Sequence, residues 1–389
     1  MQSSFLKRSF YVLLGALFIF IVIVLIATVV RRLPDSNVAV LHPTPQNIPD
    51  ATVLVTGKSD SAYFDISYWS SRQPSSRVGV AEGPQHAMLG SVRSVSVDAN
   101  QNVFILDGEY TVVRIYSTEG DYIGSFGRAG NGPGEFGDPK SIDLLESDSL
   151  AVIIGREERV IIYRRLDSLE YVFGHSFIQH DDVYSVDGCA MNGHIYVLGY
   201  SPEKDGVIHK YDLAGRFITA FGDKYVDPDP WVAASLSRRG LLACSDTHDT
   251  VAWIRQNVPV VNVCTGNGDL LERYKLQNFV PAEVTQRLTE DGRPSLSYSP
   301  PKKGESWFSN LFTDDDGAFI VSHITVVDTT SMHGDFPPEK YHAYRLNPHL
   351  GTETYLGSIP GIVAISGDKI VLRTETPFPQ VLIYEEVIP

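Results

Sequence analysis

The run Gly127–Gly134 holds four glycines, a pattern that could cradle phosphate groups with backbone N–H groups. A phosphate-binding loop needs a Lys followed by Ser or Thr after its last glycine, and then a helix. Here Glu135 and Phe136 follow, and Pro139 precedes a stretch that is typical of a strand. We therefore interpret the glycines as a tight connection between strands that uses the positive φ angles open to glycine.

Two acidic groups could bind a metal ion. Asp314–Gly317 lacks the alternating ligands and the distant Glu of an EF-hand, so we interpret it as a turn between two strands. His180–Asp182 would need further ligands, such as His323 or Glu158, because a metal site draws on several side chains. A solvated acidic loop is the preferred interpretation of this second group. A calcium or zinc ion in a central channel stays open as an alternative, with its ligands unknown.

No catalytic and no cofactor-binding residue can be assigned, because the chain has neither a Gly-x-Ser-x-Gly nor a His-Glu-x-x-His motif. The three cysteines, Cys189, Cys244 and Cys264, form no CxxC pair and no zinc-finger spacing. Cys244 and Cys264 could form a disulfide between neighbouring strands in an oxidising compartment. Buried free thiols are favoured, since an unpaired cysteine behaves as a small apolar side chain.

The 389-residue chain carries a formal net charge of −15. An acidic surface repels the phosphates of nucleic acids and the headgroups of anionic lipids. We therefore expect no nucleic-acid partner, and we do not expect the globular part to lie flat on an anionic membrane.

The segment Phe10–Val30 contains no charged residue. As a helix it would rise about 31 Å, close to the thickness of the hydrocarbon core of a bilayer. The apolar run of a cleaved signal peptide is shorter and ends at small residues, so we predict one uncleaved transmembrane signal anchor. Residues 1–9 are then a short inner tail, and residues 31–50 a Pro-rich extended linker. Basic residues flank both ends of the anchor, but the short tail favours a large domain outside the cytoplasm, in the periplasm or the extracellular space.

A repeat is the most informative feature of residues 51–389. Tyr116, Tyr163 and Tyr211 lie 47 and 48 residues apart, and each is followed by Phe-Gly ten residues later. Weaker copies end near Cys264, Tyr344 and Tyr384. Each copy lies among short β-branched and aromatic runs bounded by Asn, Asp and Gly, which are strand and hairpin signals. Six units of about 40–50 residues with four short strands each predict an all-β, six-bladed β-propeller.

The ends of the ring and its insertions need separate explanation. The last unit supplies only three strands before the chain ends, and an unpaired edge promotes association. We expect a strand from the N-terminal side to close this blade, with Ala62–Trp69 as the first candidate and Ala51–Val55 as the second. The unit spacing breaks at residues 281–306, where a short helix at Ala282–Leu288 is considered, and again at Asp328–Lys340.

The segment Phe126–Ile142 resembles the connection between blades in NHL-repeat propellers, in the FGxxGxGPGEF run followed by a proline and the next inner strand. It is most similar to bacterial, membrane-anchored six-bladed propellers of the NHL/TolB-like kind. The looser blade pattern covers Val92–Tyr384, and only Phe-Gly is kept in the later units. The resemblance implies a six-bladed ring that serves as a binding platform, although some related rings are enzymes with a metal ion in the central channel.

We expect a membrane-tethered binding module for a protein or carbohydrate partner, because a rigid scaffold with long loop insertions carries no catalytic motif. A metal-dependent hydrolase or lyase is the alternative, and it predicts several His, Asp or Glu side chains that converge on the ring axis. A purely structural subunit of an envelope assembly is a third possibility. The sequence alone identifies no ligand and no oligomeric state.

Overall fold

A computed structural model describes residues 38–41, 48–57, 62–145, 149–155, 159–166, 169–179, 183–288, 294–298, 302–327 and 339–386. The chain divides into two compact units, Met1–Leu41 with Glu283–Ser299, and His42–Ala282 with Pro300–Pro389. Within the described ranges, no helix combines the length and the apolar character needed to cross a membrane. The predicted anchor Phe10–Val30 lies outside these ranges.

The first unit contains a small antiparallel sheet in the order β1-β20-β21. Its strands are β1 (Val38–Leu41), β20 (Val284–Leu288) and β21 (Pro294–Tyr298). A strand therefore replaces the short helix considered for Ala282–Leu288, since Val284 and Thr285 are β-branched and pair with Leu41 and Val40. β1 lies inside the stretch predicted to be an extended linker.

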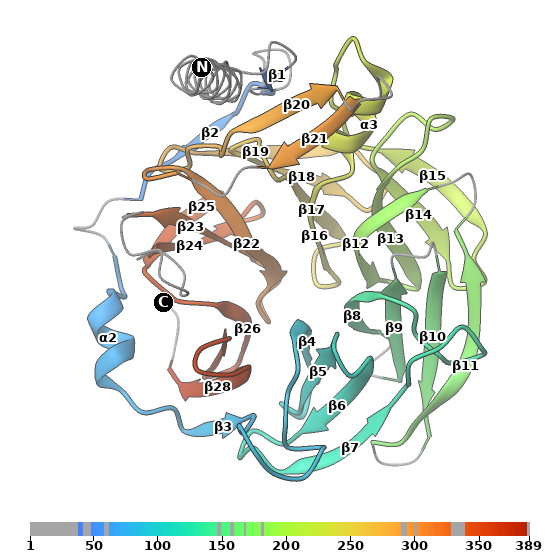
Figure 1. Ribbon diagram of the computed structural model, residues 1–389, viewed down its shortest axis with the longest axis vertical. Helices are drawn as coiled ribbons and strands as arrows, with labels where there is room; N and C mark the ends of the chain where they lie inside the picture. The colour runs from blue at the N-terminus through green and yellow to red at the C-terminus, as the bar shows by residue number, and fades with distance from the viewer. Residues whose placement is uncertain are drawn as a thin grey trace, which may run out of the picture. The chain divides into compact units, whose positions relative to one another are not determined.

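The second unit is a ring of six antiparallel sheets, seen face-on in Figure 1. Blade 1 is β4 (Val92–Val97), β5 (Val103–Asp107), β6 (Val112–Tyr116) and β7 (Tyr122–Phe126). Blade 2 is β8 (Pro139–Leu145), β9 (Leu150–Gly155), β10 (Arg159–Arg165) and β11 (Tyr171–Ile178). Blade 3 is β12 (Tyr184–Met191), β13 (His194–Tyr200), β14 (Ile208–Asp212) and β15 (Phe217–Phe221).

The other three blades follow in chain order. Blade 4 is β16 (Gly240–Ser245), β17 (Thr250–Arg255), β18 (Val260–Thr265) and β19 (Leu270–Leu276), preceded by the helix α3 (Pro230–Ser237). Blade 5 is β22 (Ser306–Thr313), β23 (Phe319–Val326), β24 (Glu339–Asn347) and β25 (Thr352–Gly357). Blade 6 is β26 (Ile362–Ser366), β27 (Lys369–Thr374) and β28 (Gln380–Glu385), completed by β3 (Ser76–Val78).

The repeated tyrosines hold the blades to the connections between them. Tyr116 and Tyr163 are almost fully buried, each in an apolar cluster. The hydroxyl of Tyr116 donates to the carbonyl of His86, and that of Tyr163 donates to the carbonyl of Gly134, each at 2.5 Å. A buried hydroxyl needs such a partner, so the repeat seen in the sequence reflects one structural role in successive blades.

The glycine-rich run forms the connection from β7 to β8. Gly127 and Gly134 have φ angles of 79° and 68°, which side chains with a Cβ rarely adopt. The carboxylate of Glu135 accepts the N–H of Gly132 at 2.8 Å and Nε of Arg128 at 2.8 Å. The loop therefore binds its own carboxylate, as expected of a structural connection between blades.

An N-terminal strap, residues 51–57 and 62–78, lies along the outer edges of blades 4, 5 and 6 (Figure 1). β2 (Val53–Val55) adds a parallel fifth strand to β19. Phe64 then forms an isolated parallel bridge with Gly357 at the end of β25. Finally β3 pairs antiparallel with β28 and supplies the fourth strand of blade 6.

The closing strand is therefore neither of the two candidates. Ala62–Trp69 leads into the helix α2 (Ile66–Ser71), whose N-cap Asp65 accepts the N–H of Tyr68 at 2.9 Å. Phe64, Tyr68 and Trp69 follow a helical spacing, and their rings contact one another. Ala51–Val55 does form a strand, but on blade 4.

Candidate functional site

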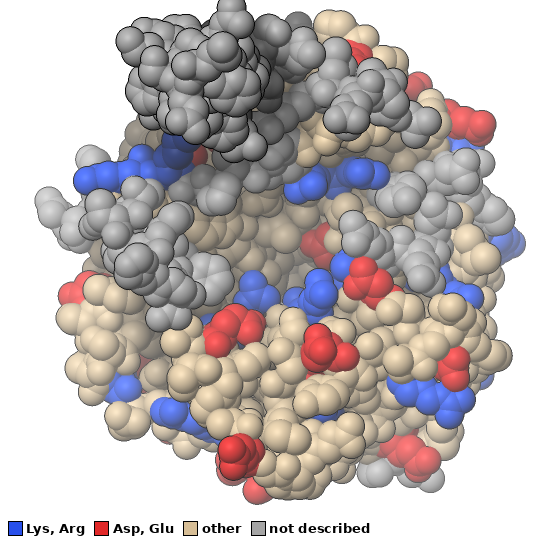
Figure 2. Space-filling view, viewed as in Figure 1, with Lys and Arg blue, Asp and Glu red and all other residues tan. Residues whose placement is uncertain are grey.

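A cavity of about 730 Å³ occupies the centre of the ring. All six innermost strands, β4, β8, β12, β16, β22 and β26, contribute to its wall. Figure 2 shows the hollow near the middle of one face, with charged side chains of both signs around it. A volume of this size is typical of sites for small ligands, roughly 300–1,000 Å³, so this central channel is the candidate site.

Bulges on the innermost strands help to shape the channel wall. The register shifts near the start of β4, β8, β12, β22 and β26, whereas β16 pairs without interruption. The residues that follow the bulges are Ser94, Ser141, Asp187, Asn310 and Ala364. A bulge bends a strand and re-aims its side chains, which turns several of these polar groups toward the next blade.

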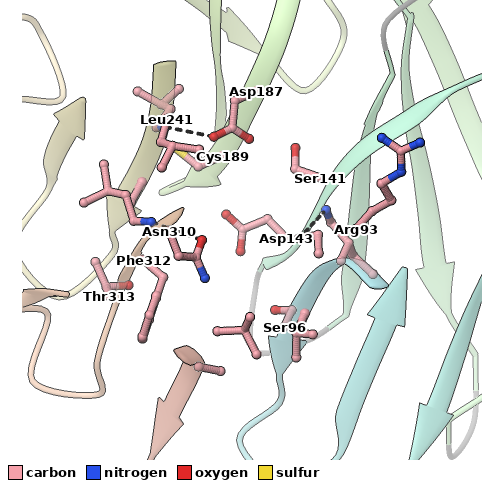
Figure 3. A pocket seen from close by; sticks show the side chains of 18 of the residues that line it. Arg93, Ser96, Ser141, Asp143, Asp187, Cys189, Leu241, Asn310, Phe312 and Thr313 are labelled. Carbon is pink, nitrogen blue, oxygen red and sulfur yellow. Dashed lines mark hydrogen bonds between the residues drawn. The ribbon is translucent and has the colours of Figure 1, made fainter. Parts of the chain in front are cut away.

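Two carboxylates in the channel wall, both labelled in Figure 3, join successive blades. Asp187 Oδ2 accepts the N–H of Leu242 in blade 4 at 2.9 Å, and its Oδ1 accepts the N–H of Gly188. Asp143 makes the same kind of link: its Oδ2 accepts the N–H of Ala190 in blade 3 at 2.8 Å, and its Oδ1 accepts the N–H of Leu144. Each carboxylate oxygen thus accepts one backbone hydrogen bond.

Asn310 makes the corresponding link without a charge. Its Oδ1 accepts the N–H of Leu311 at 3.0 Å, and its Nδ2 donates to the carbonyl of Ile362 in blade 6 at 3.1 Å. Asp187 and Asn310 both follow a bulge, but Asp187 accepts the bond from the next blade, whereas Asn310 donates it. Asn310 contacts Ile362 and Asp315 contacts Gly367, in the same order along β22 and β26, so these two strands run in the same direction along the axis.

The two channel carboxyls are hard to ionise. Burial raises the pKa of Asp143 to about 7, and the nearby carboxylates of Asp246 and Asp187 raise it as well. The hydrogen bond from the N–H of Ala190 acts in the opposite direction and lowers this pKa. Burial likewise raises the pKa of Asp187 to about 7. Among the described residues neither side chain forms an ion pair. Both groups are therefore divided between the charged and the neutral form near neutral pH.

The cationic side chains of the channel lie near the start of the innermost strands. Arg93 is exposed there, and Lys140 pairs with Asp138 at 2.7 Å. Arg373 donates to the carbonyl of Val92 at 3.1 Å. Burial lowers the pKa of Arg373, opposed by the nearby carboxylate of Glu375. One end of the channel is therefore basic.

Acidic side chains follow the opposite ends of the innermost strands. Asp246, after β16, accepts the N–H of Asn192 at 2.8 Å, and burial raises its pKa. Asp314 pairs with Arg345 at 2.6 Å, and Asp315 accepts the N–H of Gly367 at 2.5 Å. The channel therefore changes from basic to acidic along its axis.

A disulfide joins Cys189 on β12 to Cys244 on β16, with the Cα atoms 5.7 Å apart, in the wall of the channel. This corrects both interpretations of the cysteines: Cys244 pairs with Cys189 rather than Cys264, and only Cys264 is a buried free thiol. Cys264 lies on β18, and β17 separates it from Cys244. Burial raises the pKa of the Cys264 thiol to about 11.

The structure describes only some of the metal candidates drawn from the sequence. His180–Asp182 and Glu158 lie outside the described residues. His323 is fully buried inside blade 5, where its ring stacks on His342 at 4.5 Å. Asp314 begins the expected turn between β22 and β23 and accepts the N–H of Ala318 at 2.9 Å. In the part of the chain that the structure describes, no three His, Cys, Asp or Glu side chains could hold a metal ion together.

Sequence reasoning missed Asp143 and Asp187. A usable signal was present, since each follows a serine by two residues in the first strand of its unit, as Ser141-x-Asp143 and Ser185-x-Asp187. A carboxylate inside an otherwise apolar strand is rarely buried without a role. The positions of the blade-to-blade bonds depend on bulges, which the sequence does not reveal.

Residues 82–206 match the model of the DUF5128 family, described as 6-bladed beta-propeller. This match spans blades 1 and 2 and the first half of blade 3. No curated protein matches the chain.

Two solved structures share the fold. One is a protein of Bacteroides fragilis for which export has been suggested, with 10% identity, coverage of 83% of this chain and 89% of that chain, and a TM-score of 0.52. The other is a member of the DUF4221 family from Bacteroides vulgatus, with 8% identity, coverage of 79% and 94%, and a TM-score of 0.52. The predicted all-β six-bladed propeller is confirmed, whereas NHL-type repeats stay a prediction.

Proposed function

We propose that this protein is a ligand-binding propeller, tethered to a membrane by Phe10–Val30 and located outside the cytoplasm. The observation that carries the proposal is the central cavity of about 730 Å³, whose wall includes polar groups from several blades. A ligand in this position contacts a wall whose side chains are held by backbone hydrogen bonds, and such preorganisation favours affinity. A small carbohydrate or an extended peptide segment of a protein partner fits a channel of this size.

The disulfide supports the proposed location outside the cytoplasm. Disulfides persist in the periplasm and the extracellular space, and they are rare in the reducing cytosol. The Cys189–Cys244 bond lies in the wall of the proposed site, so oxidation would stabilise the part of the ring that binds the ligand. An extracytoplasmic location agrees with the apolar segment Phe10–Val30.

The test is to fill the channel with a side chain. Ser96 on β4 lines the cavity, so Ser96→Trp should occupy part of it. The full-length protein, solubilised in detergent, is screened with oligosaccharide and peptide libraries by thermal shift. We expect hits whose affinity falls at least tenfold in Ser96→Trp.

The matched control is Ser125→Trp, the same substitution on the exposed outermost strand β7 of the same blade. It should leave the affinity of every hit unchanged. Binding that survives in Ser96→Trp but is lost in Ser125→Trp would move the site from the channel to the outer edge. The absence of any hit in the unmodified protein would count against a small-ligand site.

A further inference from the structure

Two carboxyl groups lie in the channel wall without a described cation to balance them. Asp143 and Asp187 both line the cavity, and no Lys or Arg among the described residues pairs with either. The cations of the lining are Arg93, Lys140 and Arg373, near the starts of the innermost strands. Lys140 is already paired with Asp138.

Hydrogen bonds to the backbone do not saturate these two carboxyls. Each oxygen of Asp143 and Asp187 accepts one backbone N–H, which leaves a further lone pair on each oxygen for another donor. A buried charge costs free energy unless it is compensated. Two carboxyls on one wall also repel each other when both ionise. A cation bound between the two carboxyls would relieve both of these costs.

Ser141 provides a second and independent observation. It is only 6% exposed, and its Oγ has no hydrogen-bond partner among the described residues. Ser141 lines the same cavity two residues before Asp143 (Figure 3). A buried hydroxyl without a partner costs roughly 1–3 kcal/mol. Its Oγ could accept a hydrogen bond from a donor that also meets the carboxylates.

We propose that the channel binds an organic cation whose ammonium group lies between Asp143 and Asp187 and donates a hydrogen bond to Ser141. An ammonium group has three donors and no acceptor, which matches three oxygen acceptors. The cavity has room for the organic remainder of such a ligand, since its volume is about 730 Å³. The ammonium group can belong to a free polyamine or to a lysine side chain of a peptide. This inference rests on the proposed function and names the ligand class of the same site.

The remaining charged groups around the pair are consistent with this polarity. Asp246, Asp314 and Asp315 face the acidic end of the channel, and Asp314 is neutralised by Arg345. Arg93 and the Arg373–Glu375 pair lie toward the other end. A cation at the level of Asp143 and Asp187 would therefore be attracted from the acidic end and repelled by the basic end.

Binding should release protons at neutral pH. Burial raises the pKa of both carboxyls to about 7, so part of the population is protonated before the cation arrives. A bound ammonium group favours the charged form and lowers both pKa values. The observed binding enthalpy will then depend on the ionisation enthalpy of the buffer, which a simple hydrophobic ligand would not produce.

The experiment is calorimetry on the full-length protein in detergent at pH 7, in PIPES and in MOPS, two buffers without a primary ammonium group that differ in ionisation enthalpy. The probes are spermidine, Nα-acetyl-lysine amide, its uncharged isostere Nα-acetyl-norleucine amide, and calcium chloride alone. We expect proton-coupled binding of at least one ammonium probe, at least tenfold tighter than the isostere. The preferred probe tells a free polyamine from a lysine side chain. Calcium bound as tightly as the amines, or an isostere that binds equally well, would overturn the proposal.

Two variants sharpen the result. Asp143→Asn/Asp187→Asn should weaken the ammonium probe at least tenfold, whereas Asp212→Asn, the same exchange on β14 and outside the cavity lining, should change its affinity less than twofold. Since the double variant could lose its fold, the unmodified protein supplies a second test: affinity should rise at least fivefold from pH 5.5 to pH 8. A flat pH profile would refute the role of the carboxyls. If the ammonium probes fail while a neutral ligand binds and is blocked by Ser96→Trp, the proposed function stands and only this inference falls.

Discussion

Asp143 and Asp187 show how one side chain can serve both the ring and its channel. Each carboxyl joins two blades through backbone N–H groups, and each is kept partly protonated by its burial. The unfolded chain ionises such groups near pH 3.8, whereas the folded protein ionises them near pH 7. Between these values the folded state binds more protons, so the free energy of unfolding falls as the pH rises.

Asp187→Asn should therefore flatten the pH dependence of stability. We expect the unmodified protein to lose on the order of a few kcal/mol from this carboxyl between pH 4 and pH 8, and the variant to lose less. Urea unfolding of both proteins at pH 5 and pH 8 measures the difference. An unchanged difference between the two pH values would show that Asp187 ionises normally in the folded protein.

The buried histidine pair of blade 5 predicts the opposite sign. Burial lowers the pKa of His342 to about 4, and that of His323 falls well below its usual value because of burial and the neighbouring His342. Between pH 6.5 and pH 4 the unfolded chain binds more protons, so stability falls as the pH falls. Lys340 adds to the shift of His342.

Replacing His342 together with its hydrogen-bond partner should remove the part of this acid sensitivity that His342 contributes, while the part from His323 remains. Nδ1 of His342 and Oη of Tyr355 share a hydrogen bond of 3.0 Å, so His342→Phe/Tyr355→Phe removes both of its polar partners together. The unmodified protein should lose about 3 kcal/mol from His342 between pH 7 and pH 4. Urea midpoints across this range test the effect, and equal losses in both proteins would contradict it.

The sequence predicted the role of a side chain where that side chain hydrogen-bonds to backbone groups close in the sequence. It did not predict the role where the bond reaches another blade. The turn at Asp314 was predicted because its acceptors bind N–H groups only a few residues away. Asp143 and Asp187 bind N–H groups 47 and 55 residues away. No local pattern encodes such a distance, and the bulges that set the direction of the side chains are equally invisible in the sequence.

Among the elements, the disulfide between β12 and β16 should contribute strongly to stability. It joins residues 55 positions apart and restricts the unfolded chain, an effect worth about 2–4 kcal/mol. Cys189→Ala/Cys244→Ala should lose this amount in urea unfolding, and reductant should destabilise only the unmodified protein. Cys264→Ala is the control, since its thiol is unpaired. Insensitivity of the unmodified protein to reductant would mean that the bond is absent.

The N-terminal strap should stabilise the closed ring. Trp69 is 5% exposed, packs against Tyr384, and donates from Nε1 to the carbonyl of Ser358 at 2.8 Å. Trp69→Ala should lower the free energy of unfolding by about 3–5 kcal/mol, as for other buried aromatic residues. Trp231→Ala removes a 42% exposed tryptophan from α3 and should cost less than about 1 kcal/mol. Equal effects in denaturant unfolding would show that the strap does not hold the ring.

The elements themselves were predictable to different degrees. The tyrosine repeat revealed β6, β10 and β14, since each unit reuses the same strand–turn–strand pattern. The strap was not predictable in the same way, because β2 and β3 pair with strands more than 200 residues later. β3 has only three residues, Ser76–Val78, too few for an alternating pattern to stand out.

For the whole molecule, the proposal places the ring outside the cytoplasm and its N-terminus inside. Alkaline phosphatase, which is active only after export, should be active when fused after residue 389 and inactive when it replaces residues 1–9. A fluorescent protein that requires the cytoplasm should show the reverse pattern. A C-terminal fusion that is active only in the cytoplasm would contradict both the anchor and the compartment inferred from the disulfide.

The central claim is that the channel holds the ligand, and photo-cross-linking in intact cells tests it most directly. A benzophenone side chain is introduced at position 96, on the channel wall, or at position 125, on the outer edge of the same blade. Irradiation should yield a discrete cross-linked species from position 96, identifiable by mass spectrometry, and none from position 125. Cross-links from position 125 alone, or from neither position, would contradict the account.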